Sequence, residues 1–133
     1  MNALAGINWS QIQYFKPAEL ACKHCGVVGV QPALVFKLDE LREKFGKPLV
    51  VTSGYRCPVH NAAVSETGED GPHTTGLAVD LAISGRDAYV VIRLALAANW
   101  TGIGVSQKGP SRFLHLDLIP DSFGHARPMV WSY

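Results

Sequence analysis

Two histidines and an aspartate have the side chains that a catalytic metal site needs: His73, Asp80 and His115. A catalytic zinc typically takes three protein ligands from imidazole and carboxylate groups and keeps a fourth position open for water. Zinc in such a site lowers the pKa of water and polarises a carbonyl, which is the chemistry of amide hydrolysis. Residue types alone also fit histidines that lie at the surface or only make hydrogen bonds, and for His24 and His125 we expect solvent exposure.

The elements that must position this trio follow from local patterns. Residues Leu77–Ile83 and Phe113–Leu118 are apolar runs of strand length, so we expect strands that carry the aspartate and the second histidine. The stretch Cys57–Thr75 is rich in Gly, Pro, Asn, Ser and Asp and predicts a long loop with the first histidine near its end. A loop of that length in a small domain is usually functional.

Three segments, in this order along the chain, resemble one known family. They are SGYR at residues 53–56, HTTGLAVD at residues 73–80 and FLHLD at residues 113–117. Together they resemble the zinc D-Ala-D-Ala carboxypeptidases, a metallopeptidase family that includes phage and bacterial L-Ala–D-Glu endopeptidases. The similarity extends from about Phe15 to the aromatic tail.

The resemblance implies a role for four side chains. His73, Asp80 and His115 match the zinc ligands of the family. Arg56 matches an arginine that holds a carboxylate or carbonyl of the substrate near the metal, and a guanidinium suits this role because it can donate two parallel hydrogen bonds. A structural ion pair is the alternative role for this arginine.

The chain departs from the family pattern at two positions. Many relatives carry Ser two residues before the first histidine, where this chain has Gly71, and an acidic general base three residues before the last ligand, where it has Arg112. Our candidate for the base is Asp117, because on a strand it lies on the same face as His115. Alternatively, Asp117 is the third ligand and His115 the acid or base, or Asp117 is an exposed carboxylate at the strand end. Acidic residues of the loop are the remaining candidates for the base: Glu66, Glu69 and Asp70.

The three cysteines suggest a second metal site. Cys22 and Cys25 form a C-x2-C pair, and Cys57 and His60 form a C-x2-H pair, which together are typical of a structural zinc site. Such a site would tie the N-terminal segment to the loop after the substrate-binding arginine. The competing interpretations are a disulfide that uses two of the cysteines, or three inert thiols.

Composition restricts the class of protein. A chain of 133 residues with 47% hydrophobic and 17% charged residues fits one globular domain over residues 1–133. The net charge of +1 gives no basic face for nucleic acid, and no apolar run reaches the length of a membrane span. Residues Met1–Trp9 lack the features of a standard secretory signal. We expect a monomer that is made in the cytoplasm, and the resemblance then implies that it reaches the cell wall after release or lysis.

The remaining elements complete an α+β prediction. Residues Gln31–Phe45 have apolar positions at helical spacing and end before Gly46. Arg86–Asn99 predicts a second helix, although its segment Tyr89–Ile92 also suits a strand. We expect further strands in Pro48–Ser53 and Gly102–Val105, and an irregular tail over Pro120–Tyr133 whose aromatic residues Trp131 and Tyr133 pack on the body.

The predicted fold is a central antiparallel sheet with helices packed on it, similar to D-Ala-D-Ala peptidases and the hedgehog signalling domain. The predicted function is zinc-dependent hydrolysis of an amide bond in peptidoglycan stem peptides, as in a single-domain endolysin, most specifically at the L-Ala–D-Glu bond. The alternatives are a D-Ala-D-Ala carboxypeptidase and a non-catalytic, zinc-containing module that binds the cell wall.

Overall fold

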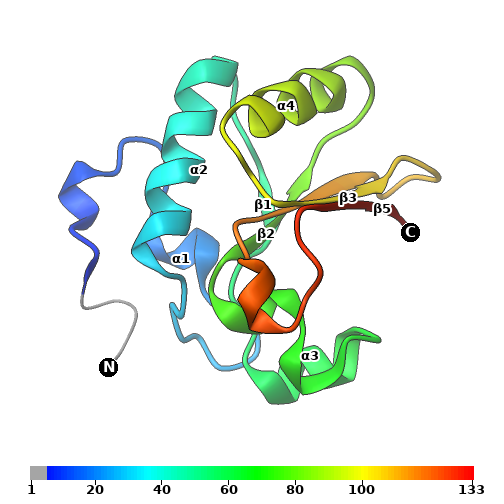
Figure 1. The fold of residues 1–133 in the computed structure, drawn as a ribbon. Helices are drawn as coiled ribbons and strands as arrows, with labels where there is room; N and C mark the ends of the chain where they lie inside the picture. Colours follow the sequence, from blue (N-terminus) through cyan, green and yellow to red (C-terminus); the bar gives the residue numbers. More distant parts are fainter. Residues whose placement is uncertain (1–5) are drawn as a thin grey trace.

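The computed structural model describes residues 6–133 and has one five-stranded sheet in the order β1-β2-β4-β3-β5 (Figure 1). The pairs β1–β2, β2–β4 and β4–β3 are antiparallel, as predicted, but β5 pairs parallel with β3 at the edge of the sheet. The strands are β1 (Val51–Ser53), β2 (Ala78–Ala82), β3 (Gly102–Ser106), β4 (Phe113–Asp117) and β5 (Met129–Ser132).

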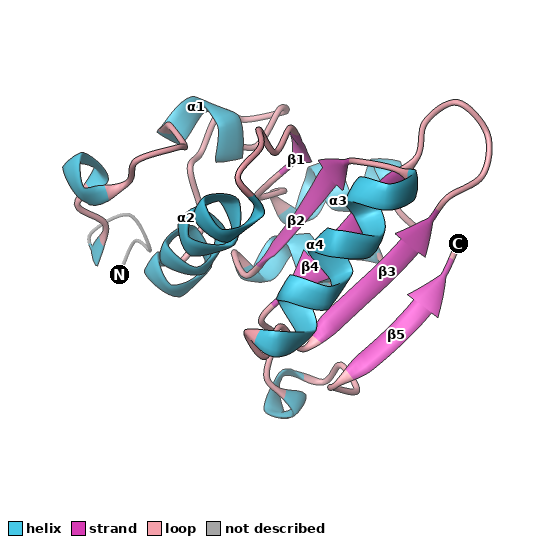
Figure 2. Cartoon of the chain, turned by 90° about the horizontal axis from the view of Figure 1, so that it is seen from above, coloured by secondary structure: helices cyan, strands magenta, loops and turns pink. Residues whose placement is uncertain are grey.

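Helices lie on both faces of this sheet. Two long ones, α2 and α4, lie side by side over one face, and α3 lies on the opposite side (Figures 1 and 2). The helices are α1 (Pro17–Leu20), α2 (Pro32–Phe45), α3 (Pro58–Val64) and α4 (Gly85–Ala97), with short 3-10 turns at Trp9–Gln11, Gly68–Asp70, Pro72–Thr75 and Asp121–Phe123. The α+β class predicted from the sequence is confirmed.

The two long helices have sequence-coded ends. Helix α2 begins with a proline at its first position and ends at Gly46, which takes the left-handed conformation (φ 78°) that favours glycine. Helix α4 is followed by Asn99 at φ 64°, and asparagine is one of the few residue types that tolerate this region. The segment Tyr89–Ile92 lies within α4, so the alternative of a strand there is wrong.

The hydrophobic core fills the space between the sheet and the helix pair. Alternate residues of β2 and β4 point toward the helices, and Val79 pairs with Leu116 while Leu81 pairs with Leu114. All four side chains are buried. Because successive residues of a strand face opposite sides, the intervening residues of the same two strands must face away from this core.

Two sequence predictions about irregular segments need correction. Residues Cys57–Thr75 are not a continuous loop, because α3 begins directly after Cys57 with Pro58 at its first position, where proline is favoured. The tail is not wholly irregular, because β5 gains its hydrogen bonds from β3. Local composition predicted neither the helix α3 nor the strand β5.

The ends of the chain add two observations. The predicted lack of a secretory signal concerns Met1–Trp9, of which residues 1–5 lie outside the described part of the structure. Across residues 6–133, none of the helices has the length and apolar character that crossing a membrane requires.

Candidate metal centre and cavity

One row of residues crosses the whole sheet on the face away from the core. Ser53 pairs with Asp80, Asp80 with His115, His115 with Gly104, and Gly104 with Trp131. The sheet register therefore places the predicted aspartate and second histidine directly beside each other on neighbouring strands. Gly104 leaves room for the indole ring, since a Cβ there would lie 2.6 Å from its nitrogen.

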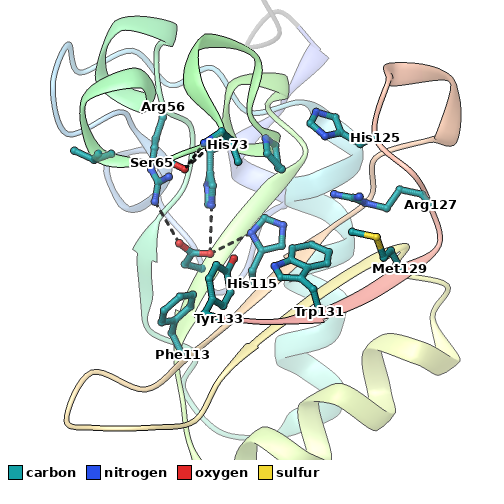
Figure 3. Close-up of a pocket in the computed structure, with 14 residues that line it drawn as sticks. Arg56, Ser65, His73, Phe113, His115, His125, Arg127, Met129, Trp131 and Tyr133 are labelled. Carbon is teal, nitrogen blue, oxygen red and sulfur yellow. Dashed lines mark hydrogen bonds and ion pairs between the residues drawn. The ribbon is translucent and has the colours of Figure 1, made fainter.

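The three predicted ligands converge on this face. The Oδ1 atom of Asp80 lies 3.3 Å from Nε2 of His73 and 3.3 Å from Nδ1 of His115. In Figure 3, dashed lines mark the contacts that His73 and His115 make. One donor atom from each of the three residues lies within 4.8 Å of the other two. His73 comes from the short turn before β2, so the set combines one turn and two adjacent strands.

The hydrogen bonds behind the two imidazoles decide which ring nitrogens carry hydrogen. Nδ1 of His73 lies 2.8 Å from the carbonyl oxygen of Gly54, and Nε2 of His115 lies 2.7 Å from Oδ2 of Asp117. Both partners only accept, so the nitrogens that face them carry hydrogen. In neutral rings, the two nitrogens that face Asp80 therefore present lone pairs.

This arrangement leaves a buried acceptor without a donor. Within the described part of the chain, Oδ1 of Asp80 is one of two buried side-chain polar atoms that lack a hydrogen-bond partner. A buried carboxylate oxygen that faces two imidazole nitrogens needs either a proton on one of the rings or a cation among the three groups. Two imidazoles held by outer hydrogen bonds and one carboxylate are the usual donors of a zinc site, so the residues fit a metal ion.

Burial and charge act in opposite directions on these groups. Burial by itself raises the pKa of Asp80, but His115 and His73 outweigh this effect and hold the pKa well below its usual range. Burial also lowers the pKa of His115, whereas Asp117 and Asp80 raise it above the ordinary value of histidine. The carboxylate is thus ionised at neutral pH and available to a cation.

Arg56 is held at the edge of this centre by three separate acceptors. Its Nε donates to Oγ of Ser53 at 3.0 Å, one terminal nitrogen to Oδ1 of Asn61 at 3.1 Å, and the other to Oδ2 of Asp80 at 3.4 Å. Guanidinium has five N–H groups, so two remain free. Asn61 is fully buried on α3, and we did not predict it because that segment was interpreted as a loop.

A cavity of about 400 Å³ opens over the metal centre. Its aromatic wall comes from Phe113, Trp131 and Tyr133, and its polar wall includes His125 and Arg127 (Figure 3). Packing of the aromatic tail was predicted, but its place at the cavity was not. The sequence did carry a signal for a strand here, because residues 129–133 contain Val, Trp and Tyr, which favour strands.

Comparison with protein families matches residues 13–117 to Peptidase M15. The chain belongs to the Peptidase M15 family. Its members are zinc metallopeptidases, so the family and the enzyme class predicted from the sequence are confirmed. A search of curated proteins found no match. The matched region contains Arg56 and the candidate ligands His73, Asp80 and His115, called the metal trio below, but stops before the tail that forms part of the cavity wall.

In this M15 peptidase, Asp117 lies behind His115 rather than in the cavity. Its carboxylate accepts hydrogen bonds from His115, from two nitrogens of Arg127 at 3.0 and 2.8 Å, and from the backbone of Ile119. Burial raises its pKa, but the bonds from His115 and Arg127 lower it to about 2. The expectation that Asp117 is an exposed carboxylate is wrong, because the side chain is fully buried.

The same geometry bears on the predicted role of Asp117 as base. A group with so low a pKa and no place in the cavity lining is poorly suited to take a proton from water. Arg127 also donates to both oxygens of Asp117. The carboxylate that lies together with His73 and His115 belongs to Asp80. The arrangement favours a positioning role for Asp117 over a role as base or third ligand.

The structure shows the surroundings of the two residues at which this chain differs from the family pattern, Gly71 and Arg112. Gly71 lies where a Cβ would collide with the side chains of Thr67 and Asn61, so the local packing leaves no room for serine. Arg112 lies outside the cavity and donates to the carbonyl of Gly109. The acidic loop residues proposed as alternative bases are exposed and do not line the cavity either: Glu66, Glu69 and Asp70.

The three cysteines of this M15 peptidase gather away from the cavity. One sulfur from each of Cys22, Cys25 and Cys57 lies within 4.8 Å of the other two, and none forms a disulfide. The predicted partner His60 is not in this group of donors. Its ring stacks instead on His24, which is exposed as expected and whose Nδ1 also contacts the sulfur of Cys57.

Proposed function

We propose that this M15 peptidase uses zinc held by His73, Asp80 and His115 to hydrolyse the L-Ala–D-Glu amide bond of peptidoglycan stem peptides. The observation that carries the proposal is the unpartnered buried oxygen of Asp80, which faces two imidazole nitrogens beneath an open cavity. When bound, zinc supplies Lewis-acid polarisation of the scissile carbonyl and lowers the pKa of water.

Three groups prepare the ligands for this ion. The Gly54 carbonyl fixes the ring of His73, and the Asp117 carboxylate fixes the ring of His115. Arg127 neutralises the buried Asp117 with a two-point contact and stacks at 5.0 Å from the Trp131 ring. Such outer contacts set the tautomer and the orientation of the ligating rings before the ion binds.

Arg56 is the proposed substrate-binding residue. Its guanidinium is anchored on three sides and keeps two N–H groups, which suits a carbonyl or carboxylate oxygen of the substrate. Stem peptides of peptidoglycan carry carboxylates along their backbone. The neighbouring aromatic wall can cover the apolar alanine methyl groups.

His125 is the proposed proton acceptor. It lines the cavity, and its Nε2 lies 3.1 Å from the carbonyl oxygen of Asp70, so Nε2 carries hydrogen and Nδ1 keeps a lone pair. Among the described residues that line the cavity, it is the only imidazole besides His73 and His115, and imidazole is the side chain that most often acts as a general acid or base.

Replacement of the proposed proton acceptor gives a direct test. We expect His125→Gln to lower the rate by roughly a hundred- to ten-thousandfold while the zinc content stays unchanged. The matched control is Glu69→Gln, an exposed position outside the cavity, which should leave the rate unchanged. A normal rate in His125→Gln would remove His125 from the mechanism.

Digestion of purified peptidoglycan, followed by mass spectrometry of the fragments, tests the proposed function. Cleavage at the L-Ala–D-Glu bond frees a new amino group on glutamate, whereas a carboxypeptidase releases free D-alanine. Release of D-alanine alone would contradict the proposed bond. Zinc-loaded protein that binds wall fragments without cutting them would contradict catalysis and favour a binding module.

A further inference from the structure

The cysteine cluster lies at the junction of two distant chain segments. Cys22 and Cys25 follow α1, and Cys57 is the residue that immediately precedes α3. The cluster contributes nothing to the lining of the active-site cavity. Three free thiols brought within 4.8 Å of one another therefore need an explanation that the peptidase reaction does not provide.

The backbone around Cys22 forms a tight turn that directs N–H groups at its sulfur. Cys22 donates to the carbonyl of Val27 at 2.9 Å, and Gly26 donates back to the carbonyl of Cys22 at 2.8 Å, with Gly26 at φ 76°. The backbone nitrogen of Cys57 lies 3.4 Å from the Cys22 sulfur. N–H groups that face a sulfur stabilise the thiolate, which is the form that binds metals.

An imidazole already contacts the cluster. Nδ1 of His24 lies 3.4 Å from Sγ of Cys57. The ring of His60 lies parallel to that of His24, with 5.6 Å between the centroids and 7° between the planes. His60 therefore supports the orientation of His24 from the side.

We propose that Cys22, Cys25 and Cys57, with His24 as the fourth ligand, hold a structural zinc ion. Three thiolates and one imidazole form a closed tetrahedral set of the kind that structural zinc prefers, and soft sulfur donors select zinc over magnesium or calcium. This proposal does not depend on the proposed peptidase reaction, because its ligands are separate from the metal trio.

The ion has a positioning consequence for Arg56. Cys57 directly follows this arginine, and the preceding Tyr55 donates to the carbonyl of Leu20 at 3.0 Å. Gly54 also lies so close to Leu20 that a Cβ there would collide with its backbone. A metal that joins Cys57 to the Cys22–Cys25 turn would thus fix the backbone on both sides of Arg56.

Metal content and cobalt absorption test the proposal on the intact protein. We expect wild-type protein to hold about two zinc ions per chain, and Asp80→Asn and Cys25→Ser to hold about one each. In cobalt-substituted wild-type protein we expect an intense thiolate-to-cobalt charge-transfer band, which the trio of two histidines and one aspartate cannot produce. Because the band is measured on wild-type protein, the test remains valid if Cys25→Ser fails to fold.

The contrary outcomes are equally specific. A wild-type chain without the charge-transfer band, or with a disulfide between two of the cysteines, overturns the site. For the fourth ligand, we expect His24→Ala to weaken cobalt binding at this site and His60→Ala to retain it. The reverse result overturns the assignment of His24 in favour of His60.

Discussion

His115 faces a carboxylate with each of its ring nitrogens, Asp80 on one side at 3.3 Å and Asp117 on the other at 2.7 Å. The two carboxylates have different surroundings. Arg127 satisfies Asp117, whereas Oδ1 of Asp80 has no hydrogen-bond partner among residues 6–133. The difference in partners explains why one carboxylate suits a metal and the other suits the task of orienting the ring.

Asp117→Asn tests this division of roles. We expect metal affinity to fall roughly ten- to a hundredfold, because an amide is a weaker acceptor for the ring N–H and leaves the charge of Arg127 unpaired. Competition with a chelator, measured beside the rate of wall hydrolysis, gives both quantities. Full metal affinity with a large loss of rate would instead restore Asp117 as the base.

Arg56→Lys tests the role of guanidinium geometry. We expect a folded protein with activity reduced on the order of a hundredfold, because an ammonium group cannot contact Ser53, Asn61 and Asp80 together and still bind substrate. The matched control is Arg112→Lys, which is exposed and outside the cavity. Equal rates in the two variants would assign Arg56 to structure alone.

At the scale of elements, two glycines of β3 make room for the site on neighbouring strands. Gly104 lies opposite both His115 and Trp131, and Gly102 lies opposite Asp117. A Cβ at Gly102 would collide with the Asp117 carboxylate, and one at Gly104 with the indole. The strand thus contributes space rather than a functional side chain.

Gly104→Ala should displace the aromatic wall. We expect a loss of stability of about 1–3 kcal/mol, the usual cost of overpacking, together with a raised KM because Trp131 lines the cavity. Thermal unfolding, the near-UV circular dichroism of tryptophan and steady-state kinetics report on these effects. Ser106→Ala on the same strand is the control, and an unchanged aromatic spectrum in Gly104→Ala would contradict the expected displacement.

At the scale of the whole molecule, the sheet separates two tasks. Helices α2 and α4 bury the apolar face, while the opposite face carries the metal trio and the cavity (Figures 1 and 3). Segments from β1, β2, β4 and β5 and from the turns between them meet at the site. A metal ion at their meeting point would bind only the folded chain and stabilise it.

Metal removal should therefore affect both activity and stability. We expect a chelator to abolish wall lysis and to lower the melting temperature, and added zinc to restore both, since a ligand that binds only the native state raises its stability. Scanning calorimetry and turbidity of a wall suspension measure the two effects. Full lysis by a metal-free preparation would exclude a metal-dependent mechanism.

The sequence by itself determined the features that depend on local pattern and on the order of motifs. Apolar spacing predicted α2, and local pattern also predicted α4, while apolar character and length predicted the strands that carry Asp80 and His115. The resemblance of three ordered segments to a known family implied His73, Asp80 and His115 as a group of ligands, and the fold does bring these residues together. These inferences succeed because helix and strand periodicity is set by each residue and its near neighbours.

The tertiary structure alone decided what lies next to the trio. The contact of Asp117 with Arg127, the place of His125 in the cavity and the anchoring of Arg56 by Asn61 all join residues through space. The parallel pairing of β5 with β3 likewise depends on a partner strand far away in the sequence. Burial and hydrogen bonding set the charge and the role of a side chain, and both follow from packing rather than from the spacing of residues along the chain.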